Sequence, residues 1–170
     1  KTRNPKSMTY LKVIMKHGKI SVKNNGPGLP VQIHTVHNEW LPEMIFGSLR
    51  TSSNYKDTGK KLTGGRNGFG AKLTNIFSKN FRVMTTDEVT KKKFDMQWTA
   101  NMSKKSTPKI KELAKPTPST TIEFEPDMSL FHGIASLDEI QDVLCKRVLD
   151  VAGTCAGLTV TLNGEKLPVK

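Results

Sequence analysis

The 170-residue sequence predicts one α+β domain, because strand-like and helix-like segments share the length of a single folding unit. Residues 11–16 and 19–23 alternate apolar with polar side chains on either side of a His-Gly dipeptide, which predicts an opening hairpin. Further strands are expected at 81–85, 93–99, 120–125 and 158–162, as neighbours in one sheet. An Asn-Gly dipeptide at 163–164 predicts a closing hairpin.

Three helices are expected among these strands. Proline at position 42 suits a first helical turn, and the apolar residues around it predict a short helix that ends near Arg50. Those apolar residues are Leu41, Ile45, Phe46 and Leu49. A second helix follows a glycine-rich segment and carries Leu73, Ile76 and Phe77 on one face. Ser136 and Glu139 form a capping box before the third helix, which Gly153 is placed to end.

Composition limits the classes of function. The net charge of +12 and the pI near 9.8 favour a polyanionic partner. A hydrophobic content of 35% without an apolar run of about 20 residues excludes a membrane-spanning helix. Cys145 and Cys155 are too few for a disulfide framework and belong to no zinc motif. The chain begins with Lys1 rather than Met, so we expect its N-terminus to continue a longer sequence.

The basic residues concentrate in segment 89–115. Eight lysines stand there against two carboxylates, a net charge of +6 and half of the total. We expect a solvated surface loop. The alternative is a DNA-facing ridge in which Lys91, Lys92 and Lys93 contact phosphates. Trp98 follows the apolar alternation, which favours a core position.

Two polar segments could contact a ligand, although each also suits an ordinary turn or cap. Asn24 ends the second expected strand and offers both a donor and an acceptor. Gly26 and Gly28 follow it and let a backbone approach a flat ligand closely. Residues 51–55 place hydroxyls and an amide just after the first helix.

A third segment, 64–73, favours phosphate binding more strongly. Four glycines within seven residues open directly onto a helix, where free N–H groups meet the positive end of the helix dipole. It is not a Walker A loop, because Ala71 precedes Lys72 and Leu73 stands where Ser or Thr would bind magnesium. No G-x-G-x-x-G register fits either, which excludes the dinucleotide fingerprint.

These motifs occur together in one known family. The order Asn-Asn-Gly-Pro-Gly-Leu-Pro from Asn24, Thr-Ser-Ser-Asn-Tyr from Thr51 and Gly-Gly-Arg-Asn-Gly-Phe-Gly-Ala-Lys-Leu from Gly64 resembles the ATPase domain of eukaryotic type II DNA topoisomerase. The resemblance covers the whole chain, 1–170, as the nucleotide-binding core. It implies the GHKL, or Bergerat, ATPase fold shared with gyrase, heat-shock chaperones, histidine kinases and mismatch-repair ATPases. That fold is a two-layer α/β sandwich with helices on one face of a mixed, mainly antiparallel sheet.

The resemblance also implies roles for individual residues. Asn24 matches the residue that takes the adenine edge, where bacterial gyrase has Asp, while Gly26 and Gly28 flatten the base pocket. Thr120 matches a strand threonine that holds a water against adenine. The matched ribose and phosphate contacts are Ser52, Ser53 and Asn54. The matched lid around the triphosphate comprises Gly65, Arg66, Asn67, Gly68, Phe69, Gly70, Ala71 and Lys72.

The catalytic groups of the family have no match in this chain. The general-base Glu, and an Asn magnesium ligand one helical turn later, are expected on a helix upstream of Lys1. The lysine that contacts the γ-phosphate is expected in a transducer domain after Lys170. We therefore expect no catalytic and no metal-binding residue here, with ATP and Mg²⁺ as cofactors of the parent enzyme. The 170 residues alone are expected to be inactive, because no substitute general base is evident.

The resemblance implies an ATP-binding gate of topoisomerase II, which couples ATP binding and hydrolysis to dimerisation and DNA strand passage. The expected partners are ATP, duplex DNA and a second copy of the parent protein, in the nucleus and not at a membrane. One alternative is a basic nucleic-acid-binding module, although an aromatic content of 6% offers few stacking platforms. A catalytically inactive relative of these ATPases is the other.

Overall fold

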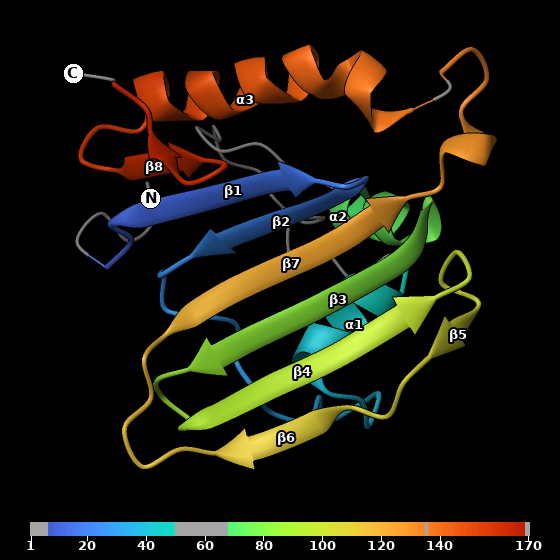
Figure 1. Ribbon diagram of the computed structural model, residues 1–170. Coiled ribbons are helices and arrows are strands. Elements are labelled where there is room, and N and C mark those ends of the chain that lie inside the picture. The colour runs from blue at the N-terminus through green and yellow to red at the C-terminus, as the bar shows by residue number, and fades with distance from the viewer. Residues whose placement is uncertain (1–6, 50–67, 135, 169–170) are drawn as a thin grey trace, which may run out of the picture.

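A mixed sheet forms the centre of the computed structural model, which describes residues 7–49, 68–134 and 136–168 (Figure 1). In this part of the chain the strand order is β5-β4-β3-β7-β2-β1-β8-β9, with β6 beside β4. The strands are β1 (Tyr10–Lys16), β2 (Lys19–Asn24), β3 (Ser78–Asp87), β4 (Lys92–Thr99), β5 (Lys104–Lys105), β6 (Lys109–Glu112), β7 (Ser119–Pro126), β8 (Thr159–Leu162) and β9 (Glu165–Lys166). Only β1 and β8 pair in parallel among these strands, so the expected mixed, mainly antiparallel sheet is confirmed.

Three α-helices and two 3₁₀ turns complete the described part. They are α1 (Leu41–Gly47), α2 (Phe69–Ile76), η1 (Met128–Leu130), η2 (Leu137–Ile140) and α3 (Gln141–Thr154). None of these helices is long and apolar enough to cross a membrane. The expected end of the first helix near Arg50 is wrong, because Ser48 already adopts an extended conformation after Gly47. Arg50 itself lies outside the described residues.

The expected boundaries of the last helix are also wrong. Ser136 precedes the short turn η2 and makes no side-chain capping bond, and α3 begins only at Gln141. Gly153 lies inside α3, which continues to Thr154. The left-handed conformation that commonly follows a helix belongs to Gly157, with φ of 70°.

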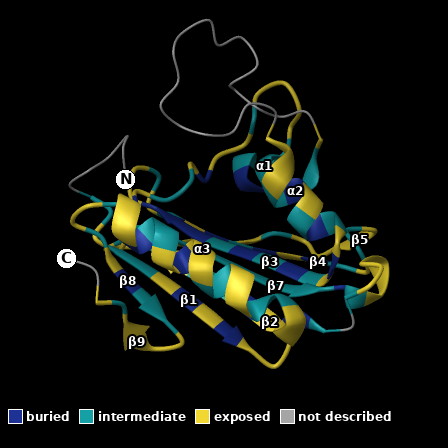
Figure 2. Ribbon diagram, turned by 90° about the horizontal axis from the view of Figure 1, so that it is seen from above, coloured by how far each residue is buried: buried dark blue, intermediate teal, exposed yellow. Residues whose placement is uncertain are grey.

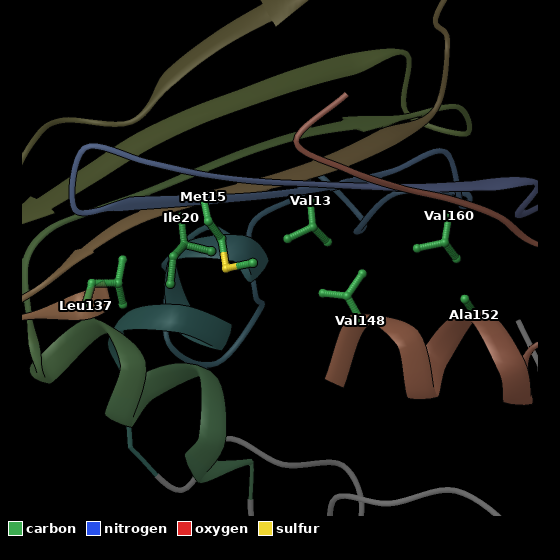
Figure 3. Packing of buried hydrophobic residues seen from close by; sticks show 7 residues of the cluster. All are labelled: Val13, Met15, Ile20, Leu137, Val148, Ala152 and Val160. Atoms are coloured by element: carbon green, nitrogen blue, oxygen red, sulfur yellow. The ribbon is translucent and has the colours of Figure 1, made fainter. Parts of the chain in front are cut away.

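The helices lie over one face of the sheet, in two separate groups (Figure 2). Helix α3 and η2 cover β1, β2 and β8 through a buried apolar cluster (Figure 3). The members of that cluster are Val13, Met15, Ile20, Leu137, Val148, Ala152 and Val160. Together with the second cluster described next, this arrangement confirms the two-layer α/β sandwich.

The second cluster lies between α1 and strands β3 and β4. Its buried members are Val31, Phe46, Phe81, Val83, Phe94, Met96 and Trp98. An apolar groove of about 380 Å³ separates the two groups of helices. Leu73 of α2 and Phe77, which directly follows this helix, line the groove and are 46% and 37% exposed. These two members of the expected apolar face therefore lie at the groove rather than in the core, whereas Ile76 does not line it.

Segment 89–115 forms β4, β5 and β6, so the expectation of a surface loop is wrong for most of it. Trp98 is only 2% exposed and belongs to the core, as its alternation indicated. Lys91 lies in the turn before β4 with φ of 54°. Lys93 pairs with Lys111 and Lys92 with Glu112, and successive strand residues point to opposite faces. The three lysines therefore do not form a single ridge.

The loop after β2 is held against the end of β3. Gly28 has φ of +82°, and a Cβ built on it would lie 2.1 Å from the Thr86 carbonyl oxygen. The Leu29 N–H donates to Thr85 Oγ1 at 2.9 Å, and the Val31 N–H donates to Asp87 Oδ2 at 3.0 Å. Glycine is therefore required at position 28 both by conformation and by space.

We predict that Gly28→Ala destabilises the protein by about 2–5 kcal/mol, since left-handed strain of about 1–2 kcal/mol adds to a backbone clash. Gly133→Ala is the matched control, because Gly133 has φ of +80° with open space around its Cβ position. The control should lose only about 1–2 kcal/mol, from strain alone. Urea unfolding measures both, and equal losses would contradict the close packing of Gly28 on β3.

Candidate nucleotide-binding site

A row of three polar side chains crosses the three central strands of the sheet near one end of these strands. Asn24 of β2 is the register partner of Thr120 in β7, which in turn is the partner of Thr85 in β3. The three side chains lie on the face of the sheet that points toward the helices. Further along the same strands, the residues on this face are apolar: Val22 of β2, for example, is the register partner of Ile122 of β7. Polar groups thus replace the apolar lining on the helix side at this end of the sheet.

Thr85 organises this row. Its side chain is 1% exposed, accepts the Leu29 N–H, and lies 3.1 Å from Thr120 Oγ1. Its hydroxyl also donates to the Ser119 carbonyl oxygen at 3.2 Å. Because these bonds use the hydroxyl fully, Thr85 fixes the glycine loop and the Thr120 hydroxyl relative to each other.

Asn24 forms a local turn with the glycines that follow it. Its Oδ1 accepts the Gly26 N–H at 2.9 Å, and Gly26 is buried. An amide oxygen carries two lone pairs, so Oδ1 keeps one acceptor position after this bond. The Asn24 Nδ2 group makes no hydrogen bond to a residue that the structure describes. The side chain is oriented by the turn yet keeps hydrogen-bonding capacity for a ligand.

Asp87 supports the same loop from the far end of β3. It is 4% exposed and accepts hydrogen bonds from the Val31 and Val89 N–H groups and from the Thr90 hydroxyl. Burial raises the pKa of this carboxyl, but hydrogen bonds from Thr90, Val31 and Val89 outweigh burial and hold it below its ordinary value. Asp87 is therefore ionised at neutral pH and anchors the loop.

The glycine segment reaches the described residues at the start of α2. Gly68 caps this helix in the left-handed conformation, with φ of 68°, and no side chain caps it. Gly68, Phe69 and Gly70 are exposed. Because the first N–H groups of a helix have no intrahelical partner, this end can donate several hydrogen bonds to an anion.

Lys72 lies one turn into α2 in an unfavourable place for a cation. Its side chain is 2% exposed, and its ammonium donates to the Gly68 carbonyl oxygen at 3.0 Å. Burial lowers the pKa of Lys72 below its ordinary value. The positive end of the helix dipole adds a further unfavourable interaction. An anion bound at this helix end would relieve both costs.

Asn75 holds α2 against α1. It is fully buried, and its Nδ2 donates to the Phe46 carbonyl oxygen at 3.1 Å. Phe46 in turn lies against Phe81 of β3, with ring centroids 5.9 Å apart. The position of the Lys72 ammonium relative to the sheet therefore depends on the packing of these two helices.

The structure brings part of the expected site together. Asn24, Gly26, Gly28 and Thr120 meet at the end of the sheet described above, and Gly68, Phe69, Gly70, Ala71 and Lys72 form the start of α2. No hydrogen bond or ion pair among the described residues joins the two groups. The other expected contacts lie outside the described residues: Ser52, Ser53, Asn54, Gly65, Arg66 and Asn67.

Two supporting residues, Thr85 and Asp87, were missing from the interpretation of the sequence. Thr85 is a polar residue at an inward position of a strand, after Phe81 and Val83, and this break in the pattern could have revealed it. Asp87 carries no comparable signal. The described residues contain no group of three His, Cys, Asp or Glu side chains that could hold a metal ion.

Comparisons with known proteins give one consistent result. No family model matches the chain. Among curated proteins, DNA topoisomerase 2 of Plasmodium falciparum is 47% identical over 170 residues, which is 100% of this chain and 12% of that protein. DNA topoisomerase 2-beta of Gallus gallus is 47% identical over 167 residues, which is 96% of this chain and 10% of that protein. The chain thus spans about a tenth of the length of these relatives.

Solved structures agree with the sequence comparison. The ATPase region of Saccharomyces cerevisiae topoisomerase II matches with a TM-score of 0.90 and 43% identity, covering 96% of this chain and 44% of that chain. The ATPase and transducer domains of DNA topoisomerase II from Balamuthia mandrillaris match with a TM-score of 0.90 and 44% identity, covering 98% and 44%. Sequence and fold together make this chain a homologue of the ATPase region of eukaryotic type II DNA topoisomerase.

Proposed function

We propose that this chain is the nucleotide-binding core of an ATP-operated gate in a type II DNA topoisomerase. The observation that carries the proposal is the buried Lys72 ammonium at the N-terminus of α2, which lacks a negatively charged partner among the described residues. A bound triphosphate supplies that charge. The proposal is favoured over a basic nucleic-acid-binding module because buried charge and free helix N–H groups suit a compact anion.

The adenine base is assigned to the polar row at the end of the sheet. The exocyclic amino group of adenine donates to the free lone pair of Asn24 Oδ1, and the Thr120 hydroxyl orients a water against the base. Gly26 and Gly28 keep side chains out of the base plane, and Gly28 has no room for a Cβ. Thr85 and Asp87 hold this wall in place before the nucleotide arrives.

The phosphates are assigned to the segment that ends at Lys72. The first-turn N–H groups of α2 and the Lys72 ammonium contact phosphate oxygens. The negative charge of the phosphates favours the charged form of Lys72, which burial disfavours. Gly65, Arg66 and Asn67 complete this lid in the proposal, and Ser52, Ser53 and Asn54 contact ribose and phosphate. Glycines allow the backbone, rather than side chains, to follow the triphosphate.

Hydrolysis requires groups that we do not assign to this chain. A general base must reach the attacking water, and we assign this role to a Glu upstream of Lys1. ATP is used with Mg²⁺, for which we also assign no ligand here. Capture of ATP then promotes association of two gates around duplex DNA, in a nuclear enzyme that acts as a homodimer. The homology to the ATPase region supports these wider assignments.

We predict that Asn24→Ala weakens ATP binding by about 1–3 kcal/mol, the cost of leaving a buried partner unpaired. Asn24→Asp keeps an acceptor oxygen and should retain most of the affinity. Asn80→Ala is the matched control, since Asn80 donates to Glu125 on the face of the sheet without helices. Calorimetric titration with a non-hydrolysable ATP analogue measures all three, and unchanged affinity for Asn24→Ala would refute the adenine assignment.

We predict that Lys72→Met changes ATP affinity and the stability of the nucleotide-free protein in opposite directions. ATP affinity should fall because a phosphate partner is lost, whereas the nucleotide-free protein should become more stable because a buried charge is removed. The folded-state pKa of Lys72 lies below its unfolded value, so the unfolded state binds the proton more tightly. The stability gained by the variant should therefore shrink as pH rises from 7 toward the ordinary lysine pKa of about 10.4.

Denaturant unfolding at several pH values, with and without nucleotide, measures these effects. Lys146→Met is the control, because Lys146 is exposed on α3 and pairs with Asp150. A nucleotide-free Lys72→Met protein that is less stable than the wild type at pH 7 would contradict the electrostatic assignment.

We also predict that the 170 residues, purified alone, show no steady-state ATP hydrolysis above background. The expected reason is the lack of a positioned general base. Lys72 cannot take that role, because phosphates hold its ammonium protonated. A phosphate-release assay tests this, and sustained Mg²⁺-dependent release that Gly68→Trp and Gly70→Trp abolish would show that this chain carries catalytic groups.

A further inference from the structure

The face of the sheet without helices carries lysines in directly opposed pairs. Lys12 pairs with Lys23 and Lys16 with Lys19 across β1 and β2, and Lys93 pairs with Lys111 across β4 and β6. All six side chains are exposed. Like charges directly opposite each other in a sheet are destabilising, so these pairs are costly in the absence of an anion. We call the six residues the lysine face.

The carboxylates on the same face bond mainly to other groups, although Lys93, after Arg82, contributes to lowering the pKa of Asp95. Asp95 accepts two hydrogen bonds from Arg82, at 2.8 and 2.7 Å, and Glu123 lies 3.8 Å from the same guanidinium. Glu125 accepts a hydrogen bond from Asn80 at 3.1 Å. None of the six lysines makes an ion pair with a residue that the structure describes. Lys12 lies over the Tyr10 ring, with its ammonium 5.1 Å from the ring centroid, and this contact leaves its charge unneutralised. Most of the positive charge of the lysine face is therefore available to a partner.

A shallow hollow of about 320 Å³ joins the two ends of the lysine face. Lys12 and Lys23 border it on one side and Lys93 borders it on the other. Ser119 and Thr121 of β7 lie between them and offer hydroxyl donors, and Glu123 is the one carboxylate in the lining. Hydroxyl groups between lysines suit the sugar-phosphate backbone of a nucleic acid, which accepts hydrogen bonds from hydroxyls and from ammonium groups.

The spacing favours an extended polyanion over a small anion. Lys23 on β2 and Lys93 on β4 are three strand intervals apart, about 14–15 Å at the usual strand spacing. One phosphate group cannot contact both. Two phosphates across a groove of duplex DNA can, since the major groove is about 12 Å wide and lysine side chains are long and flexible.

We propose that the lysine face is a docking surface for the backbone of duplex DNA, with Lys12, Lys23, Lys93 and Lys111 as phosphate contacts. The inference rests on the proposed function in that duplex DNA is the polyanion such a gate meets. The lysine face lies on the opposite side of the sheet from Asn24 and Lys72, so DNA and nucleotide can be bound together. The contacts are to phosphates, and the surface therefore binds without sequence preference.

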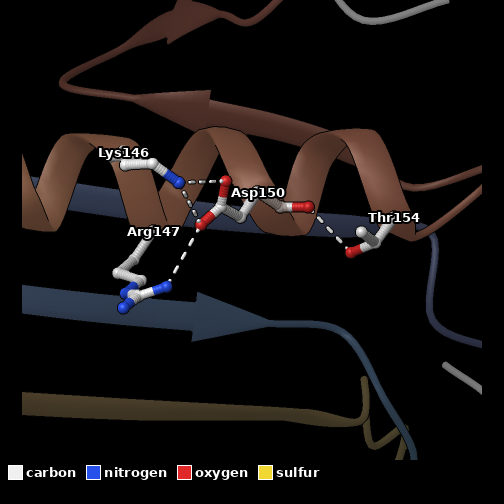
Figure 4. Close-up of polar contacts among 4 residues, drawn as sticks. All are labelled: Lys146, Arg147, Asp150 and Thr154. Atoms are coloured by element: carbon white, nitrogen blue, oxygen red, sulfur yellow. Dashed lines mark hydrogen bonds and ion pairs between the residues drawn. The ribbon is translucent and has the colours of Figure 1, made fainter.

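The test is lysine footprinting of the purified protein that contains this chain. Acetylation rates are measured by mass spectrometry with and without a 30-base-pair duplex, at low and high salt. The duplex should slow acetylation of Lys12, Lys23, Lys93 and Lys111, and high salt should remove this protection. Lys146 should be unaffected, because it lies on α3 beside Asp150, over the other face (Figure 4). Unchanged rates at the lysine face with DNA present would overturn the proposal.

Two charge-matched variants complete the experiment. Lys12→Gln with Lys23→Gln should reduce the salt slope of duplex binding by about 1.8, at about 0.9 per phosphate contact. Lys146→Gln with Arg147→Gln removes the same charge and should leave the slope unchanged. Equal slopes for both variants would overturn the proposal, as would protection of the lysine face by polyglutamate but not by DNA. ATP-analogue affinity should stay at the wild-type value in both, so failure of the nucleotide assignment would be visible separately.

Discussion

The pairing of β7 between β2 and β3 is the constraint on which the rest of the molecule depends. It places Thr120 between Asn24 and Thr85, and on the same face it places Ile122 between Val22 and Val83. A slip of one residue would turn Thr120 and its apolar neighbours to the opposite face, because side chains alternate along a strand. The polar row would then be lost, and Ile122 and Phe124 would no longer pack against the two apolar clusters.

The same alternation separates two kinds of chemistry. The helix side combines apolar burial with a few polar groups of fixed orientation, and it ends in the Lys72 ammonium at the start of α2. The other side carries exposed lysines on a polar surface. Nucleotide binding and contact with a long polyanion can therefore act on one sheet without competing for the same atoms. Lys72 is buried without a negatively charged partner among the described residues, and such a local conflict is typical of a functional site within an otherwise consistent fold.

Most of the fold could be predicted from local patterns, whereas several details could not. Alternation located the strands, and the glycine segment before α2 indicated an anion site. The strand expected at 93–99 and the core position of Trp98 are confirmed, whereas the wider expectation of a surface loop over 89–115 was wrong because the lysines dominate the composition of that segment. The expected ends of α1 and α3 differ from the observed ends at Gly47 and Thr154 by a few residues, which is the usual uncertainty of helix boundaries inferred from local patterns.

The sequence by itself determined where residue types suited to a phosphate and a base occur. It could do so because the conformational freedom of glycine, the dipole of a helix and the donors and acceptors of a side chain are properties of a few neighbouring residues. Only the tertiary structure decided what holds those residues. Thr85 and Asp87 each lie 56 positions from the loop N–H groups that they bind. The lysine pairs likewise depend on strand register across β1, β2, β4 and β6. Such contacts arise from packing a whole sheet against its helices, and no local pattern encodes which distant strand becomes the neighbour.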